Sequence, residues 1–225
     1  MLLRNDDIIL SGTFEARLND GAWTTVSWGD VSHETDYNLV KACDASKETI
    51  SFGEKLQIRG LDKWNVCSLK VTCAGGAKVY GKLADSLTPE YAASTTAYKL
   101  ASFFNYSTGL KDASGLDLGD IALADACYSG MFSGCTNLTQ APALPATTLA
   151  DSCYNNMFYK CTSLTQAPAL PATTLANYCY SSMFKSCTNI TELHYPASVQ
   201  NDSTFKGMSG SPWFGATNAT VHYDL

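Results

Sequence analysis

The sequence holds nine cysteines, whose thiols can bind metals, form disulfides or act as nucleophiles. Six of them recur at two positions in each of three consecutive 26-residue segments. Cysteines of structural zinc sites are usually separated by about two to four residues. The two cysteines of each segment stand eight positions apart and no Cys-x-x-Cys pair occurs, which argues against zinc. The six recurring cysteines are Cys127, Cys135, Cys153, Cys161, Cys179 and Cys187.

These cysteines are expected to form columns, because equivalent residues of stacked repeats lie about 4.8 Å apart. That distance is within disulfide reach, but a column of three always leaves one cysteine unpaired, and stacked Cβ vectors run parallel instead of converging. We therefore predict buried free thiols that pack as small hydrophobic side chains. Cys43, Cys67 and Cys73 lie outside the columns, and a bridge between Cys67 and Cys73 stays open.

The three histidines give no catalytic pattern. His33, His194 and His222 are dispersed, and the chain has no G-x-S-x-G, H-E-x-x-H or Walker motif. A nucleophilic Cys187–His194 pair is the alternative to a core thiol beside a surface imidazole, and we favour the second interpretation. We predict that the protein is not an enzyme and takes no cofactor and no metal.

Composition and charge argue against several classes of binding partner. The 225 residues are 45% hydrophobic and 16% charged, which is a globular composition. A formal net charge of −6 without a run of basic residues argues against nucleic acid and against an anionic membrane surface. No apolar stretch approaches the roughly 18 residues of a transmembrane helix, and the start "MLLRNDDIILSGTF" does not resemble a secretory signal. We predict no nucleic-acid partner and no membrane insertion.

Residues 1–78 read as a small β domain. In "GTFEARLNDGAWTTVSW", Phe14, Ala16 and Leu18 alternate onto one face before the Asn-Asp-Gly turn at 19–21, which predicts a hairpin with a return strand from Trp23 to Trp28. Further short strands are predicted in "ETISF", "KLQIRG" and "CSLKVTC".

The segment that positions the cysteines is a repeat. The copies 127–152 and 153–178 are identical at 19 of 26 positions, and a third copy follows at 179–204. Leu149, Cys153 and Met157, spaced i, i+4, i+8, predict a short helical face, with Thr148 and Asp151 as its capping box. The following "CTSLTQA" is expected to be extended up to the proline corner. A single coil cannot bury its apolar side, so the coils must stack.

The motif Met-Phe-x-x-Cys-Thr-x-Leu-x-x-Ala, followed by Leu-Pro, resembles the BspA-like, or Treponema-type, leucine-rich repeat. The third copy is most similar, through Phe184, Cys187, Ile190, Leu193, Tyr195 and Pro196. The resemblance implies a mixed α/β repeat, in which a short leucine-rich-repeat solenoid follows the small all-β N-terminal domain. The expected domains are 1–78, the repeats at 79–205, and a C-terminal cap at 206–225.

The resemblance also implies a function. BspA-like proteins are known mainly from bacterial surfaces, which predicts a non-catalytic recognition or adhesion protein, extracellular or at the cell surface, that binds a protein or glycan on another surface. The alternative is a phage virion component, such as a fibre or tail-associated adhesin.

Two sets of side chains compete as the binding surface. Tyr159, Lys160 and Lys185 differ from their counterparts in the other copies and supply aromatic and cationic anchors, and Tyr178 is a further non-recurrent tyrosine. The recurrent Tyr128, Tyr154 and Tyr180 are instead expected to pack between coils. The alternative surface is a polar ladder on the strand face: Thr139, Gln140, Thr165, Gln166, Thr191 and Glu192.

Overall fold

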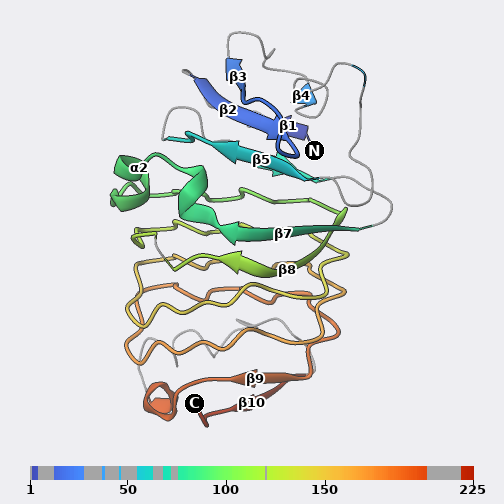
Figure 1. Cartoon of the computed structure of the whole chain (residues 1–225). Helices are drawn as coiled ribbons and strands as arrows, with labels where there is room; N and C mark the ends of the chain where they lie inside the picture. Colours follow the sequence, from blue (N-terminus) through green and yellow to red (C-terminus); the bar gives the residue numbers. More distant parts are fainter. Residues whose placement is uncertain are drawn as a thin grey trace.

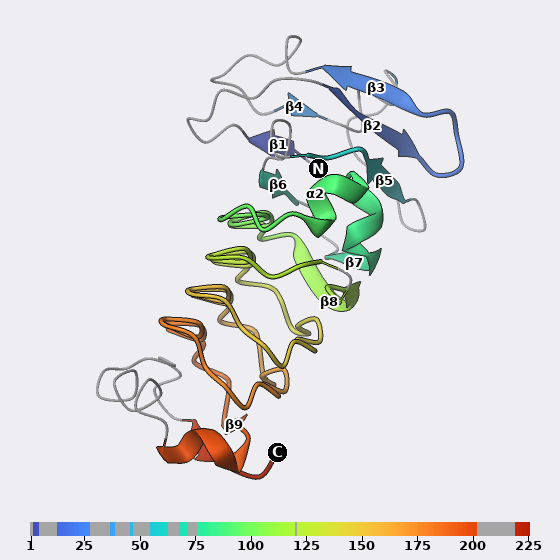
Figure 2. The same cartoon turned by 90° about the vertical axis from the view of Figure 1, so that its left-hand side faces the viewer.

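A computed structural model describes residues 2–4, 13–27, 37–38, 46, 55–62, 68–71, 76–119, 121–201 and 219–225. Figures 1 and 2 show two small sheets at one end, a stack of coils in the middle, and a short pair of strands at the other end. Among the described residues, no helix is long and apolar enough to cross a bilayer.

The N-terminal part contains two three-stranded antiparallel sheets. One has the order β4 (Tyr37–Asn38), β1 (Leu2–Arg4), β6 (Ser68–Lys70), and the other the order β3 (Thr24–Ser27), β2 (Thr13–Leu18), β5 (Leu56–Arg59).

The predicted hairpin is confirmed as β2 and β3. Phe14 pairs with Val26, and both side chains are buried together with Ala16. The turn begins at Asn19, whose φ is 54°, and the N–H of Gly21 donates to the carbonyl of Leu18 over 3.1 Å. The strands predicted in "KLQIRG" and "CSLKVTC" appear as β5 and β6, whereas "ETISF" lies outside the described residues.

A parallel strand pair leads into the stack. It consists of β7 (Ala77–Lys82), which spans the domain boundary predicted after residue 78, and β8 (Leu110–Asp117). Between them lie the 3₁₀ helix η2 (Leu83–Ser86) and the single-turn helix α2 (Pro89–Ala93). The Lys78 ammonium lies 2.8 Å from the Asp112 carboxylate, and this contact, with that of Ser114, lowers the pKa of Asp112 to about 2.

The coils of the stack are built from consecutive tight turns. In the first clear copy, the N–H groups of Cys127, Ser129 and Met131 each donate to the carbonyl three residues earlier. The residues between them donate to the next coil instead, as Tyr128 does to the Cys153 carbonyl over 2.9 Å. Every fourth residue has a positive φ, the conformation that the third residue of a type II turn requires. These residues are Ala126, Gly130 and Gly134 in the first copy, Ser152, Asn156 and Lys160 in the second, and Tyr178, Ser182 and Ser186 in the third.

The predicted fold class, a mixed α/β leucine-rich-repeat solenoid, is therefore wrong. Among the described residues the only α-helix is the five-residue α2, and the strands form small separate sheets. The expected capping box does not exist, because Thr148 forms an isolated parallel bridge with Thr174 and the Asp151 carboxylate accepts a hydrogen bond from the backbone N–H of Asn177.

The error has a physical cause. Turns that repeat every four residues place residues i, i+4 and i+8 on one side, and that spacing imitates one face of a helix with 3.6 residues per turn. The predicted extended segment is also missing from the second copy, where 161–167 contains no strand. At the equivalent place in the third copy, β9 (Glu192–His194) pairs in parallel with β10 (Thr220–His222), and the 3₁₀ helix η3 (Ala197–Asn201) follows β9.

Aromatic columns fill the interior of the stack. The rings of Phe132, Phe158 and Phe184 stack at 5.6 Å between neighbouring centroids, and Phe104 extends this column at 5.5 Å. Tyr128, Tyr154 and Tyr180 form a second column at 5.8 and 6.0 Å, which confirms that these recurrent tyrosines pack between coils.

The six recurring cysteines are free and buried, as predicted. Cys135, Cys161 and Cys187 donate their thiol hydrogens to backbone carbonyls of the preceding coil, with S···O distances of 3.0–3.1 Å. Burial raises the pKa of Cys135 and of Cys187 to about 12, so the thiols stay protonated at neutral pH. Cys43, Cys67 and Cys73 lie outside the described residues.

A buried lysine side chain, that of Lys99, binds the backbone at the start of the stack. The Lys99 side chain is 0% exposed, and its ammonium donates to three backbone carbonyls, those of Ala92, Ser94 and Ala122. The ammonium also lies 5.7 Å from the centroid of the Tyr91 ring. Burial lowers the pKa of Lys99. The three donors of the ammonium thus each have a backbone acceptor, and one of these, the Ala92 carbonyl, also accepts the N–H of Ala122.

Candidate recognition surface and histidine cluster

Each clear copy has three residues with positive φ, four positions apart, which we call the first, second and third corners of its coil; Tyr98, Ser102 and Tyr106 hold these positions in the preceding coil. We call the row of side chains at the third corner the third-corner row; it is defined by Tyr106, Tyr159, Lys160 and Lys185. Backbone hydrogen bonds place these residues along four neighbouring coils, because the N–H of Tyr106 donates to Ser133, that of Gly134 to Tyr159, and that of Lys160 to Lys185, over 2.7–2.8 Å. The second of these coils contributes Ser133 and Gly134, which are not members of the row.

The structure brings together three of the four predicted binding residues. Tyr159 is half-buried, Lys160 and Lys185 are exposed, and the Lys160 ammonium lies 5.1 Å from the centroid of the Tyr159 ring. Tyr178 is 60% exposed but occupies the first corner of its coil, whereas the third corner of that coil is at Ser186.

Tyr106 is a member of the row that the sequence did not single out. Its ring is 49% exposed and lies across the next coil, where a Cβ at residue 134 would stand only 2.6 Å from its Cδ1 atom. Gly134 therefore leaves the space that the ring occupies. The available signal was the degenerate early copy of the repeat, because the alignment of Phe103-Phe104 with Met131-Phe132 also aligns Tyr106 with Gly134.

The alternative strand-face residues do not form one continuous ladder in the structure. Thr139 donates its hydroxyl to the Lys111 carbonyl over 3.0 Å, and Gln140 forms an isolated bridge with Asp112. At the other end, the Thr191 carbonyl accepts the N–H of Thr220, and Glu192 is the first residue of β9. Thr165 and Gln166 are exposed and lie in a segment without strand.

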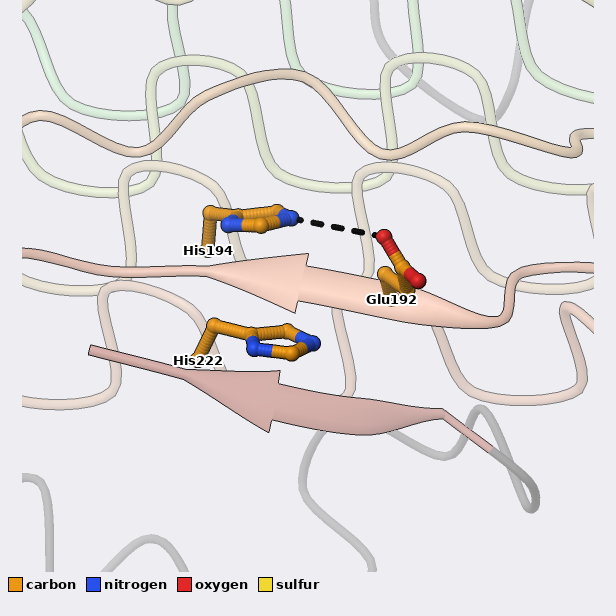
Figure 3. Close-up of side chains that lie close together, drawn as sticks. All are labelled: Glu192, His194 and His222. Atoms are coloured by element: carbon orange, nitrogen blue, oxygen red, sulfur yellow. Dashed lines mark ion pairs between the residues drawn. The ribbon is translucent and has the colours of Figure 1, made fainter. Parts of the chain in front are cut away.

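A cluster of titratable side chains lies at the far end of the stack, on β9 and β10. The parallel register pairs His194 with His222, and alternation along β9 places Glu192 on the same face, while Leu193 points into the core. The imidazole rings stack at 4.8 Å with 13° between their planes. In Figure 3 each ring directs one nitrogen to the side on which the Glu192 carboxylate lies.

The His194 imidazole contacts two carboxylates, those of Asp224 and Glu192. Its Nδ1 lies 2.7 Å from the Asp224 carboxylate, and its Nε2 lies 3.7 Å from that of Glu192. The contact with Asp224, followed by that with Glu192, raises the pKa of His194. The suggested Cys187–His194 pair is thus not formed, because the Cys187 thiol donates to the Phe158 carbonyl.

Sequence reasoning missed this cluster because it treated the three histidines as dispersed. The signal lay in their spacing, since His222 follows His194 at the same interval at which Phe132 follows Phe104, so that the repeat continues beyond its third clear copy. No family model matches the sequence, and neither a curated protein nor a solved structure matches the chain, so the likeness to BspA-like repeats stays a prediction drawn from the motif.

Proposed function

We propose that the protein is a non-catalytic recognition protein that binds a protein or glycan on another surface through the third-corner row. It would act outside the cell or at a cell surface. The observation that carries this proposal is a row of tyrosine and lysine side chains displayed on three of four neighbouring coils of a hydrogen-bonded backbone.

The side-chain types in the row suit recognition. Tyrosine supplies a large, stiff and amphipathic contact area at a low cost in conformational entropy, and it is enriched where binding energy concentrates. The Lys160 ammonium beside the Tyr159 ring, with exposed Lys185 on the next coil, favours a ligand that offers acidic groups next to an apolar face. Proteins and acidic glycans both meet this description.

The rigidity of the backbone supports the same conclusion. Tyr106, Gly134 and Lys160 each donate their N–H to the neighbouring coil, so the spacing of the row is fixed before any ligand arrives. A preorganised surface loses little entropy on binding. Two tyrosines at the first corner, Tyr98 and Tyr178, are also exposed, by 72% and 60%. The acidic Asp125 and Asp151 are exposed on the same side of the coils, so that corner combines tyrosine with acidic side chains and not with lysine.

The test replaces Tyr159 and Lys160 together by alanine. The full-length chain is first applied to an array of sulfated, sialylated and neutral glycans and to immobilised cell-surface proteins. For any ligand found, the double substitution is expected to weaken binding at least tenfold in titration, because it removes the central anchors of the row. The melting temperature should fall by no more than about 2–4 °C, which corresponds to about 1 kcal/mol in a chain of this size, since one side chain is half-buried and the other exposed.

Two matched variants give the control. Tyr178→Ala changes a tyrosine of the first corner, and Thr165→Ala with Gln166→Ala changes the strand face. Binding that survives the loss of Tyr159 and Lys160 would contradict the proposal, and binding lost only with Thr165 and Gln166 would assign the site to the strand face.

A further inference from the structure

We propose that Glu192, His194 and His222 form a binding site for one divalent transition-metal ion, of which Zn²⁺ is the physiological candidate, and that the ion ties β10 to β9. The three residues offer two imidazole nitrogens and a carboxylate oxygen that all lie within 4.8 Å of one another. This site differs from the sequence-based expectation that the protein takes no metal, and it is separate from the third-corner row.

The donor set fits such an ion in type, and the donor atoms lie close enough together for side-chain rotations to bring them onto one ion. Zinc takes imidazole nitrogen and carboxylate oxygen at about 2.0–2.2 Å, and tetrahedral bonds of that length place donors about 3.3 Å apart. The Nε2 atom of His194 already lies 3.7 Å from the Glu192 carboxylate. Because the Glu192 side chain is 64% exposed, rotation of its carboxylate can bring it closer to both imidazoles. The two rings, stacked at 13°, must also tilt toward each other for a nitrogen of each to reach one ion.

The orphaned nitrogen of His222 is an independent sign of a missing partner. Its Nε2 atom is buried from solvent and has no hydrogen-bond partner among the described residues. A buried polar atom without a partner costs about 1–3 kcal/mol. In Figure 3 this ring lies directly beside that of His194, with the carboxylate of Glu192 nearby. A metal ion between the three side chains would satisfy the Nε2 lone pair.

Asp224 contacts His194 at the ring nitrogen that does not face Glu192. Its carboxylate contacts Nδ1 of His194 at 2.7 Å, and a proton held there leaves the lone pair of His194 on Nε2, the atom that faces Glu192. Metal-binding histidines usually donate their other ring N–H to a carboxylate in this way, which fixes the tautomer and strengthens the ligand. Asp224 is therefore a positioning residue for His194 and not itself a ligand.

The position of the site gives the ion a structural role. β10 pairs with β9 over only three residues, Thr220–His222. An ion held by residues of both strands would fasten this short strand across the exposed end of the stack. Zinc usually takes four ligands, so three protein ligands leave at least one coordination position for water.

The experiment titrates the full-length chain, freed of metal by a chelator, with Zn²⁺ in isothermal titration calorimetry under a reductant that does not bind metals. We expect one Zn²⁺ per chain and a metal-dependent rise in melting temperature. His222→Gln should weaken binding at least tenfold, and Asp224→Asn by about tenfold, the loss typical of a carboxylate that orients a metal-binding histidine. Binding of Co²⁺ should give a visible spectrum of nitrogen and oxygen ligation, without a thiolate charge-transfer band.

Two controls keep the outcome decisive. His33→Gln removes the remaining histidine of the chain, and Glu90→Gln removes an exposed carboxylate on α2. Both should bind Zn²⁺ like the original chain, and the metal-free melting temperature of His222→Gln should match that of the original chain. No stoichiometric binding, undiminished binding by His222→Gln, a thiolate band with Co²⁺, or an equal loss in His33→Gln would each overturn the site.

Discussion

Replacing Phe158 by alanine is expected to lower the free energy of unfolding by about 3–5 kcal/mol, the range for removing a buried phenylalanine side chain. Phe158 is 0% exposed and stands in the middle of its column, stacked at 5.6 Å on Phe132 on one side and on Phe184 on the other. The substitution therefore leaves a cavity and also breaks two ring contacts, each of which is worth about 0.5–1.5 kcal/mol beyond burial. Denaturant titration of the full-length chain measures the change.

The neighbouring residue provides the comparison. Tyr159→Ala removes a ring of similar size that is only half-buried, so its effect should stay below about 1 kcal/mol. Phe158→Leu should fall between the two, because it keeps most of the volume and loses only the stacking. A loss for Phe158→Ala no larger than that for Tyr159→Ala would show that the column does not carry the stability of the stack.

Lys99→Met is the second substitution with a large expected effect, about 2–4 kcal/mol of lost stability, because each buried carbonyl left without a partner costs about 1–3 kcal/mol. The carbonyls of Ser94 and Ala122 lose the ammonium donor, whereas that of Ala92 keeps the N–H of Ala122. Methionine keeps the apolar stem of the side chain but cannot donate to the carbonyls of Ala92, Ser94 and Ala122. Part of this loss is offset, because methionine removes the desolvation cost of the buried ammonium charge. Thermal and denaturant unfolding of the variant give the measurement.

Lys185→Met serves as its control, because Lys185 is exposed and its substitution should change stability by less than about 0.5 kcal/mol. If Lys99→Met were as stable as the original chain, the buried ammonium would not be required to satisfy the irregular backbone between α2 and the first coil.

The hairpin of β2 and β3 and the interior columns could be predicted from the sequence, each for a local reason. The Asn-Asp-Gly run at 19–21 marks the turn of the hairpin from adjacent residues alone, although the positive φ is at Asn19 and not in the Asp-Gly pair. The columns follow from the identity of residues one repeat period apart, because equivalent positions of stacked coils must meet. The same argument predicts the buried thiols, the tyrosine column and the placement of Lys185 one coil away from Tyr159.

The turn-built backbone could not be predicted in the same way. Ala126 and Ser152 adopt φ angles of 54° and 57°, a region that residues other than glycine seldom enter. Their conformation is set by hydrogen bonds to the next coil, such as that from Ala126 to Asp151, and not by local preference. The apolar spacing at every fourth position was therefore interpreted as a helix.

Tyr106 and the histidine cluster were not singled out because the repeat changes at the ends of the stack. The interval that relates Tyr106 to Gly134, and His194 to His222, is two positions longer than the interval between the clear copies. Recognising the histidine cluster also requires the strand pairing of β9 with β10, which joins segments that no repeat motif connects.

The central claim, that the repeat region is a stack of turns whose coils keep the register of the sequence repeat, is tested most directly by nuclear Overhauser effects in the full-length chain. The account predicts contacts between ring protons of Phe132 and Phe158 and between those of Phe158 and Phe184, because their centroids lie 5.6 Å apart. It also predicts that contacts between Hα of residue i and Hβ of residue i+3 do not run through 149–161. A continuous series of such helical contacts there, without the ring contacts between coils, would contradict the account.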